Sequence, residues 1–261
     1  MSRRFAAVVA HPDDDTFGVA GTVALHADDA GFHFTLIHAT SGEAGPIADP
    51  ALATRKTLGR VREEEDRRSW VTLGREPDRH EWLRYPDHRL DEVPFDELVD
   101  RIAAILREER PDVVSTFGPD GITGHPDHVT VGRATEEAFH RLSSEGVPGF
   151  RRLIRVAIPS SLIDSWNERL VASGREPFDP TELYQPRGVP DETIGLAVDT
   201  SGVAALVVRA LREHRTQAGD IQEQMSEDEQ LQAVSRENGV IVWPPSEPGA
   251  PVLNDVFEGL D

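Results

Sequence analysis

The stretch Phe5-Ala6-Ala7-Val8-Val9-Ala10 leads directly into His11-Pro12-Asp13-Asp14-Asp15, and this junction decides the interpretation of the fold. An unbroken apolar run of this length is typical of a strand that is buried on both faces of a parallel sheet. Ligands of open α/β folds bind beyond the carboxyl ends of such strands. The imidazole and the three carboxylates that follow the run therefore mark a candidate functional site.

The crowded carboxylates of Asp13, Asp14 and Asp15 repel one another unless a cation compensates their charge. A divalent metal would do so. Histidine together with aspartate is a ligand set of the zinc type, whereas calcium and magnesium favour oxygen ligands alone. The alternative is that the aspartates cap a helix, because carboxylates suit the positive end of the helix dipole.

A second cluster, His125-Pro126-Asp127-His128, follows another apolar strand, at 112–117, and a loop rich in glycine and proline at 118–124. Its two histidines share one face if the segment is helical; otherwise they are exposed loop residues. In a common doubly wound order the first and fourth strands are neighbours, so both clusters would face one crevice. Three protein ligands and a water there would form the pattern of a catalytic zinc site.

Apolar strands alternate with amphipathic helices along most of the chain, which predicts a Rossmann-like α/β fold. We expect a doubly wound, mostly parallel sheet with helices on both faces and a C-terminal α+β extension. The expected strands are 5–10, 32–38, 80–83, 112–117, 153–158 and 193–198. The expected helices are 16–30, 54–73, 95–109, 126–142, 201–217 and 226–237.

All 261 residues are interpreted as one catalytic domain with a variable part from about residue 150. Segment 174–190 shows no clear period, yet it contains Phe178, Leu183 and Tyr184. Loops of this length are often lids or contact surfaces, so we expect it to cover the crevice or to contact another subunit.

Composition excludes several classes of function. The chain has no cysteine, which rules out disulfides and thiolate metal sites. Its net charge of -20 repels nucleic acid and anionic membranes, so neither is an expected partner. No apolar run approaches the ~20 residues of a membrane helix, and run 5–10 is too short for a signal peptide. We therefore expect no membrane insertion and a cytoplasmic location.

Taken together, the two motifs resemble those of the LmbE-like, or PIG-L, family of zinc-dependent N-deacetylases, which includes N-acetylglucosaminyl deacetylases. That family carries AHPDDE after its first strand and an HPDH-type motif after a later one. The resemblance covers about residues 5–217. It also includes Gly42-Glu43, Arg62 with Glu65, Pro86-Asp87 and His214-Arg215-Thr216-Gln217.

The resemblance implies a role for each matching residue. These roles are metal binding by His11, Asp14 and His128, general-base catalysis by Asp13, transition-state stabilisation by His125, orientation of a histidine by Asp127, and substrate binding by Arg62, Asp87 and Glu43. One departure is Asp15, which stands where the family motif has glutamate, so we interpret it as a residue behind the ligands.

Other polar and aromatic residues are interpreted as structural. Arg62 has an alternative as a surface charge paired with Asp66, and the acidic run 63–66 is interpreted as a solvated helix face. Trp70 and Trp82 are interpreted as core residues, and His214 as either a core or a site residue. The histidines without an evident cluster are His26, His33, His80, His88 and His140.

The implied activity is zinc-dependent hydrolysis of an N-acyl amide, in particular N-acetyl, on a small amino sugar or its conjugate. One alternative is an amidase acting on thiol conjugates of an amino sugar. Another is a metal-dependent glycosyltransferase that uses the Asp-x-Asp pattern at 13–15, although this leaves His11, His125 and His128 without a role. A third is a non-enzymatic zinc-binding protein. The resemblance also suggests a homo-oligomer.

Overall fold

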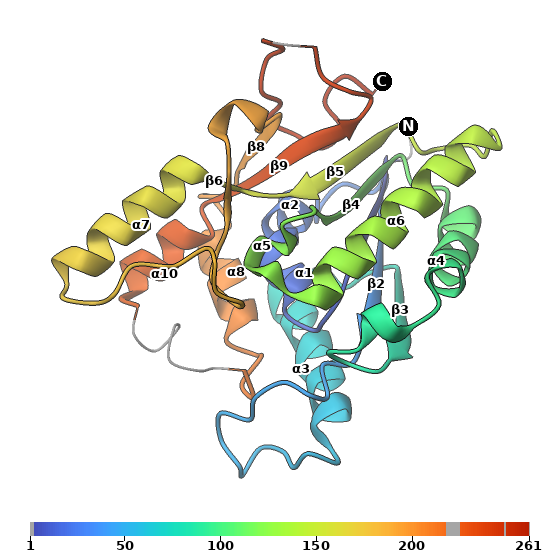
Figure 1. Ribbon diagram of the computed structural model, residues 1–261. Helices are drawn as coiled ribbons and strands as arrows, with labels where there is room; N and C mark the ends of the chain where they lie inside the picture. The colour runs from blue at the N-terminus through green and yellow to red at the C-terminus, as the bar shows by residue number, and fades with distance from the viewer. Residues whose placement is uncertain (1–2, 218–224, 248, 261) are drawn as a thin grey trace.

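Five parallel strands form one side of a seven-stranded sheet in the computed structural model, which describes residues 3–217, 225–247 and 249–260 (Figure 1). The order across the sheet is β3-β2-β1-β4-β5-β9-β8. The parallel strands are β1 (Arg3–Val9), β2 (Phe32–Thr40), β3 (Arg79–Tyr85), β4 (Val113–Phe117) and β5 (Arg152–Val156). The expected neighbourhood of the first and fourth strands is confirmed by the pairing of β1 with β4.

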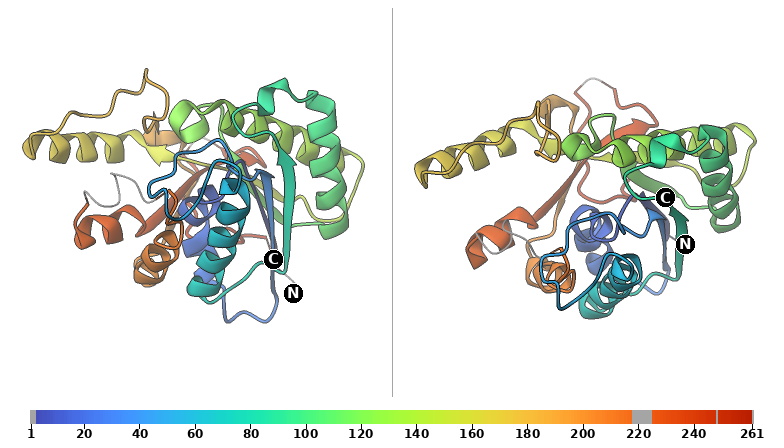
Figure 2. Two further views of the ribbon diagram at one scale, coloured as in Figure 1. Left: turned by 90° about the horizontal axis from the view of Figure 1, so that it is seen from below. Right: turned by 60° about the horizontal axis from the view of Figure 1, so that its bottom comes forward.

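Helices cover both faces of this sheet, as expected for a doubly wound fold (Figure 2). One face carries α4 (Phe95–Glu109) and α6 (Pro126–Ser144). The other face carries α1 (Asp14–Gly18), α2 (Ala20–Leu25), α3 (Leu58–Leu73) and α8 (Ala204–Leu211). Phe5, Phe34 and Trp70 pack together on the α3 side, and all three are almost fully buried.

Close packing of α6 on β4 fixes the position of the second histidine motif. A Cβ atom on Gly132 would lie 2.5 Å from the carbonyl oxygen of Phe117, so a larger residue would push the helix away from the strand. The N-terminus of α6 consequently lies at the carboxyl end of β4. That end is next to the carboxyl end of β1, where the first motif begins.

The C-terminal part extends the sheet by antiparallel pairing. Strand β9 (Arg236–Trp243) lies between β5 and β8 (Leu196–Asp199) and runs antiparallel to both. Helix α7 (Ser160–Ala172) and α10 (Glu227–Ala233) lie at the same side of the molecule (Figures 1 and 2). The short elements are β6 (Ile158–Pro159), β7 (Gly188–Val189), α5 (Gly121–Gly124), η1 (Leu90–Glu92) and η2 (Asp191–Thr193).

Several expected boundaries were wrong. The helix expected at 16–30 is divided into α1 and α2, because Val19 leaves the helical conformation (φ −142°). The helix expected at 226–237 ends at Ala233, and the chain then enters β9, which the sequence analysis missed along with α7. The loop expected at 118–124 contains the short helix α5.

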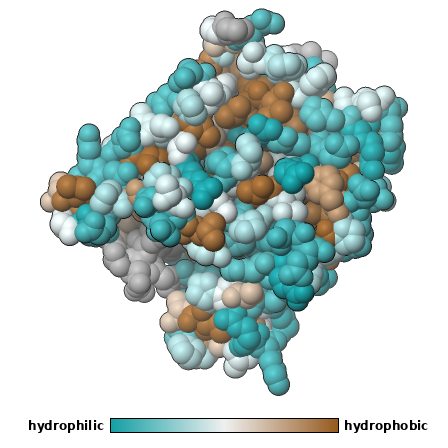
Figure 3. All heavy atoms as spheres, viewed as in Figure 1, coloured by the Kyte–Doolittle hydropathy of each residue, from teal (hydrophilic) through white to brown (hydrophobic). Residues whose placement is uncertain are grey.

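The visible surface is mostly hydrophilic, with apolar patches scattered between polar side chains, in keeping with the charge of −20 (Figure 3). Within the described part of the chain, no helix combines the length and the apolar character needed to cross a membrane.

Candidate active site

Three side chains from the two motifs meet between the carboxyl ends of β1 and β4. Nδ1 of His11 lies 3.2 Å from Nε2 of His128 and 3.3 Å from Oδ2 of Asp14. Oδ1 of Asp14 lies 3.2 Å from Nε2 of His128. Ligands held tetrahedrally at 2.0–2.1 Å from zinc are separated by about 3.3 Å. The two ring nitrogens thus have the spacing that a tetrahedral metal ion needs, and the Asp14 carboxylate brings one oxygen to a similar distance from each of them.

Neighbouring acceptors orient both imidazoles. The other nitrogen of His11, Nε2, lies 3.0 Å from Oδ1 of Asp87 and 3.3 Å from Oδ2 of Asp127. Nδ1 of His128 bonds the carbonyl oxygen of Gly121 at 2.9 Å. In its neutral form, each ring that carries its proton on the nitrogen facing these acceptors presents a lone pair to the cluster. Metal-binding histidines are commonly held in this way.

Asp13 stands beside this cluster in a strained backbone conformation, with φ of 108°. Its Oδ2 accepts a bond of 3.1 Å from Arg62, whose guanidinium also donates to the carbonyl oxygens of Pro12 and Gly42. Burial raises the pKa of Asp13 to about 7, although the charge of Arg62 opposes this rise. Because Arg62 is 4% exposed and bound to these groups, its interpretation as a surface charge paired with Asp66 is wrong.

His125 caps helix α6, since its Nδ1 accepts the backbone N–H of Asp127 at 3.1 Å. A neutral imidazole whose Nδ1 accepts must carry its proton on Nε2, so the other edge of this ring is a donor. Burial lowers the pKa of His125 to about 4, with the charges of His11 and His128 acting in the same direction. The neutral ring therefore still offers one N–H.

A second grouping around the same atoms contains His125 in place of Asp14, because His11, His125 and His128 also approach within 4.8 Å of one another. Asp14 fits a metal better for two reasons. Its carboxylate supplies negative charge, and its oxygens lie 3.2 to 3.3 Å from both other donors. His125 has its Nδ1 occupied by the helix cap.

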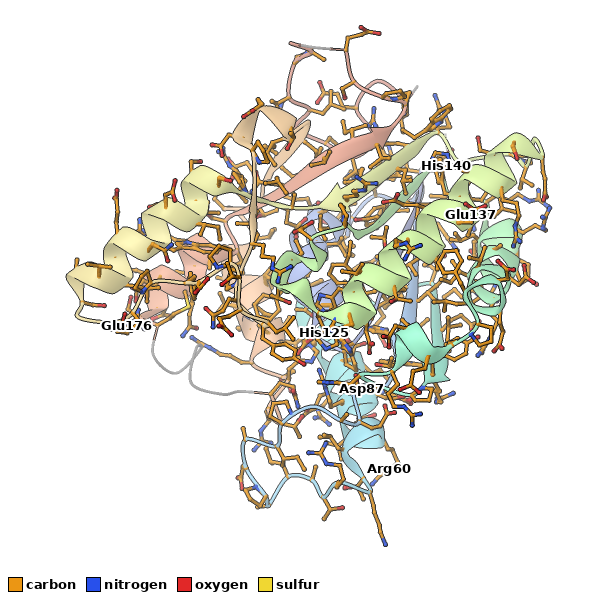
Figure 4. All side chains as sticks on the ribbon, in the orientation of Figure 1. Arg60, Asp87, His125, Glu137, His140 and Glu176 are labelled. Carbon is orange, nitrogen blue, oxygen red and sulfur yellow. The ribbon has the colours of Figure 1, made fainter. Side chains whose placement is uncertain are left out.

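The cluster opens into a cavity of about 480 Å³. Its lining comes from both motifs, the loops after β2 and β3, helix α3 and segment 174–190. It comprises His11, Asp13, Asp14, Ala44, Gly45, Pro46, Arg62, His88, His125, His128 and Tyr184. Figure 4 shows His125 and Asp87 close together near the middle of the molecule, whereas His140 lies towards the other end of α6.

Glu43 and Asp87 lie behind the cavity rather than in its lining, in the part of the chain that the structure describes. Oδ2 of Asp87 accepts the backbone N–H of Ala44 at 2.7 Å, and Oε1 of Glu43 accepts the backbone N–H of Asp87 at 2.9 Å. Together they fasten the loop after β2 to the loop after β3. Their contacts support a positioning role in place of direct substrate binding.

Asp127 is also fully buried and binds backbone donors. Its carboxylate accepts the N–H groups of His88 at 2.8 Å and Leu90 at 3.1 Å while facing His11. Asp15 is equally buried and accepts a bond of 2.7 Å from Nε1 of Trp70, so its carboxylate points away from the cavity and into the interior.

His88 lines the cavity although the sequence analysis did not expect it there, whereas Tyr184 belongs to the segment that was expected to cover the crevice. His88 was interpreted as structural, but its ring lies 4.8 Å from that of His125. Tyr184 reaches the cavity because its backbone N–H bonds the carbonyl oxygen of Thr123, and its ring centre is 5.4 Å from that of His125. The apolar content of segment 174–190 was the available signal for Tyr184, and the position of His88 after Pro86-Asp87 was the signal for His88.

His214 was left open as a core or a site residue, and the structure places it in the interior. It is 2% exposed, and its Nε2 lies 3.0 Å from Oγ1 of Thr16. Nearby, Glu65 binds the backbone N–H and the hydroxyl of Thr216. These contacts join α3 to the end of α8, so this motif connects helices behind the cavity.

Comparison with known proteins gives a family match and several relatives. Residues 6–139 match the PIG-L family, described as GlcNAc-PI de-N-acetylase. A 1D-myo-inositol 2-acetamido-2-deoxy-alpha-D-glucopyranoside deacetylase from Thermobifida fusca (strain YX) is 32% identical over 241 residues, which cover 82% of this chain and 83% of that protein.

Two solved structures share the fold at lower identity. N,N'-diacetylchitobiose deacetylase from Pyrococcus horikoshii has a TM-score of 0.62 at 22% identity and covers 95% of this chain and 85% of its own. The 4-carboxy-2-hydroxymuconate hydratase GalB from Pseudomonas putida KT2440 has a TM-score of 0.61 at 18% identity, covering 95% of this chain and 99% of its own. Because these two reactions differ, the fold alone does not define the chemistry.

Proposed function

The chain belongs to the PIG-L family of de-N-acetylases, and on that premise we propose that it uses zinc, held by His11, Asp14 and His128, for its reaction. It is an enzyme of the deacetylase class, which hydrolyses the N-acetyl amide of an amino sugar. The observation that supports the metal assignment is the 3.2 Å between Nδ1 of His11 and Nε2 of His128, with one oxygen of Asp14 3.2 to 3.3 Å from each of these nitrogens.

The donor set fits a metal ion in chemistry as well as in spacing. Two neutral imidazoles and one carboxylate are the kind of ligand set found in catalytic zinc sites with an open position. Nδ1 of His11 and Nε2 of His128 are the nitrogens that would bind the metal. They can do so as unprotonated nitrogens because the opposite nitrogen of each ring donates its N–H, from His11 to Asp87 and Asp127 and from His128 to the carbonyl oxygen of Gly121. When bound, zinc supplies a nucleophilic water at neutral pH and polarises the substrate carbonyl.

Asp13 is the proposed general base. It lines the cavity next to a proposed ligand, and the bond from Arg62 fixes its carboxylate. There it takes a proton from the attacking water and later delivers it to the leaving amine. Arg62 is then a positioning residue, since its guanidinium holds Asp13 and the backbone of both adjoining loops.

His125 is the proposed donor to the oxyanion. Its Nε2–H is left for the cavity because Nδ1 caps α6, and its placement is rigid for the same reason. A donor that is fixed before the reaction stabilises developing negative charge without reorganisation. Asp87 and Asp127 contribute indirectly by holding the ring of His11.

We propose an N-acetylglucosaminide as the substrate. The relative from Thermobifida fusca is named for such a compound joined to inositol, and the cavity of about 480 Å³ has room for a sugar ring. Tyr184 and His88 offer aromatic surface and polar groups at its edge. A thiol conjugate of an amino sugar is a related candidate, and parallel assays would separate the two.

The Asp-x-Asp glycosyltransferase alternative has no support from the position of its carboxylates. Asp15 is fully buried against Trp70, and Asp13 is paired with Arg62. The pattern therefore does not present two free carboxylates to one ligand.

A matched pair of histidine variants tests the proposal. His128→Ala should lose the active-site metal and lower acetate release from an N-acetylglucosaminide by at least about 10²-fold, because it removes a metal ligand. His140→Ala is the control, since His140 is exposed on the same helix. Unchanged acetate release by His128→Ala would contradict the ligand assignment, whereas no release by fully metal-loaded unaltered protein would contradict the substrate class.

A further inference from the structure

A second group of metal-binding side chains lies outside the active site, between α3 and the edge of the sheet. His38 comes from β2, His80 from the edge strand β3 and Asp66 from α3. One donor atom of each lies within 4.8 Å of the others. None of the three lines the active-site cavity, and they are absent from the proposed reaction.

The donor atoms within this cluster face one another closely. Nδ1 of His38 and Nε2 of His80 are 3.0 Å apart, and Nε2 of His80 is 3.5 Å from Oδ2 of Asp66. The other nitrogen of His38, Nε2, lies 3.2 Å from Oδ1 of Asp15. This arrangement repeats the one at His11, with a carboxylate behind the ring and a ring nitrogen pointing into the cluster.

The buried carboxylate of Asp66 is an independent indication that this cluster binds a cation. It is completely buried, and within the described residues neither of its carboxylate oxygens accepts a hydrogen bond. Its nearest imidazole nitrogens are Nε2 of His80, 3.5 Å from Oδ2, and Nε2 of His38, 3.7 Å from Oδ1. A buried carboxylate without donors is strongly unfavourable unless it takes a proton or binds a cation. The expectation that run 63–66 is a solvated face was therefore wrong for Asp66.

We propose that His38, His80 and Asp66 bind a second divalent metal ion, of the zinc type, which joins β2, β3 and α3. Two imidazoles and a carboxylate form an N/O donor set that suits zinc better than calcium or magnesium. The ion would bond both of the facing imidazole nitrogens and would give the Asp66 carboxylate, which accepts no hydrogen bond from the described part of the chain, a cation to bind. Asp15 would accept the remaining N–H of His38.

The site has a route to solvent and a link to the active site. The side chain of His80 keeps 17% of its surface exposed, while Trp82 stacks on His38 with ring centres 4.1 Å apart. Asp15 follows Asp13 and Asp14 directly, and it is anchored by both Trp70 and His38. A metal bound by His38 would thus fix the position of Asp15, and with it the neighbouring Asp13 and Asp14, without contacting the substrate.

Metal counting tests this proposal independently of catalysis. Protein saturated with Zn²⁺ and then dialysed should contain two zinc ions per chain by inductively coupled plasma mass spectrometry. Asp66→Asn, which keeps the size of the side chain and removes its charge, should contain one. His80→Ala should also contain one. His33→Ala is the control, because His33 lies on β2 outside both clusters and should leave the count at two.

If Asp66→Asn fails to fold, the active-site variant His128→Ala still tests the second site, because it leaves His38, His80 and Asp66 intact. His128→Ala should retain one zinc ion, which stabilises the folded protein, so added Zn²⁺ should raise its melting temperature. His128→Ala combined with His80→Ala should bind none. A count of one in unaltered protein, with none in His128→Ala, would overturn the second site and leave the proposed function intact. Loss of acetate release by His128→Ala alone bears on the proposed function only.

Discussion

Replacement of His125 can separate catalysis from helix capping, because the two edges of its ring have different partners. Nδ1 accepts the backbone N–H of Asp127 at 3.1 Å and caps α6, and the ring lines the cavity. Asparagine is among the best N-cap residues, whereas alanine is among the poorest. His125→Asn therefore removes the imidazole donor and keeps a cap, and His125→Ala removes both.

The two contributions have different sizes. Loss of one preorganised oxyanion donor lowers kcat by about 10² to 10³-fold, so both variants should be slow to this extent. Loss of the cap costs about 1 kcal/mol of unfolding free energy, so His125→Ala alone should be less stable. For a protein of this size the difference corresponds to about 2 to 4 °C in Tm.

Three measurements on both variants test this reasoning. Acetate release at saturating substrate gives kcat, thermal unfolding gives Tm, and elemental analysis gives the zinc content. A change confined to KM would show that His125 binds ground-state substrate instead of the transition state. A loss of zinc equal to that in His128→Ala would make His125 a ligand and would favour the grouping of three histidines.

Other perturbations follow from single contacts. Gly132→Ala should lower the free energy of unfolding by about 1 to 3 kcal/mol, because the added Cβ would lie 2.5 Å from the backbone of Phe117. Gly202→Ala is the control and should leave stability unchanged, because a Cβ there meets nothing within 4 Å. Equal Tm values for the two variants would refute the close approach of α6 to β4. Tyr184→Ala should raise KM several-fold, because Tyr184 lines the cavity. Leu183→Ala is the control and should leave KM unchanged, because Leu183 is exposed and does not line the cavity. Equal KM values for the two variants would exclude contact between Tyr184 and the substrate. Burial raises the pKa of Glu237 to about 7, against the hydrogen bonds from Thr22 and Gly21. Its unfolded value is about 4.3, so its contribution to stability is present below that pH and is lost as pH rises through 7. In urea unfolding, the free energy of unfolding of Glu237→Gln should therefore fall less between pH 5 and pH 8 than that of the unaltered protein. The same pH dependence in both proteins would contradict the raised pKa of Glu237.

The parallel half of the fold could be predicted because its signals are local. Apolar strands such as β1 and β4 alternate with amphipathic helices, and the predicted helix at Phe95–Glu109 matches α4 to the residue. Strand β9 could not be found in this way. Its residues are mostly half-buried, and its pairing with β5 and β8 depends on contacts distant in sequence.

The proximity of His11, Asp14 and His128 could be predicted because two motifs with strong chemical character follow adjacent strands. The functions of Glu43, Asp87 and Arg62 could not be separated from sequence alone, since each is a polar residue near the motifs. Their positions depend on backbone groups such as the N–H of Ala44 and the carbonyl of Gly42. The sequence placed segment 174–190 at the crevice or at a subunit contact, but that Tyr184 is the residue of this segment that lines the cavity depends on its backbone bond to Thr123.

The most direct test of the central claim is a chelator titration that follows acetate release and bound zinc in the same samples. With an N-acetylglucosaminyl-inositol substrate, we expect the enzyme to release equal amounts of acetate and free amine. Hydrolysis should fall in proportion to the loss of one zinc ion per chain, the ion that His128→Ala also loses, and should return when Zn²⁺ is restored. Acetate release that persists in metal-free protein would contradict the account, as would its absence at full zinc occupancy.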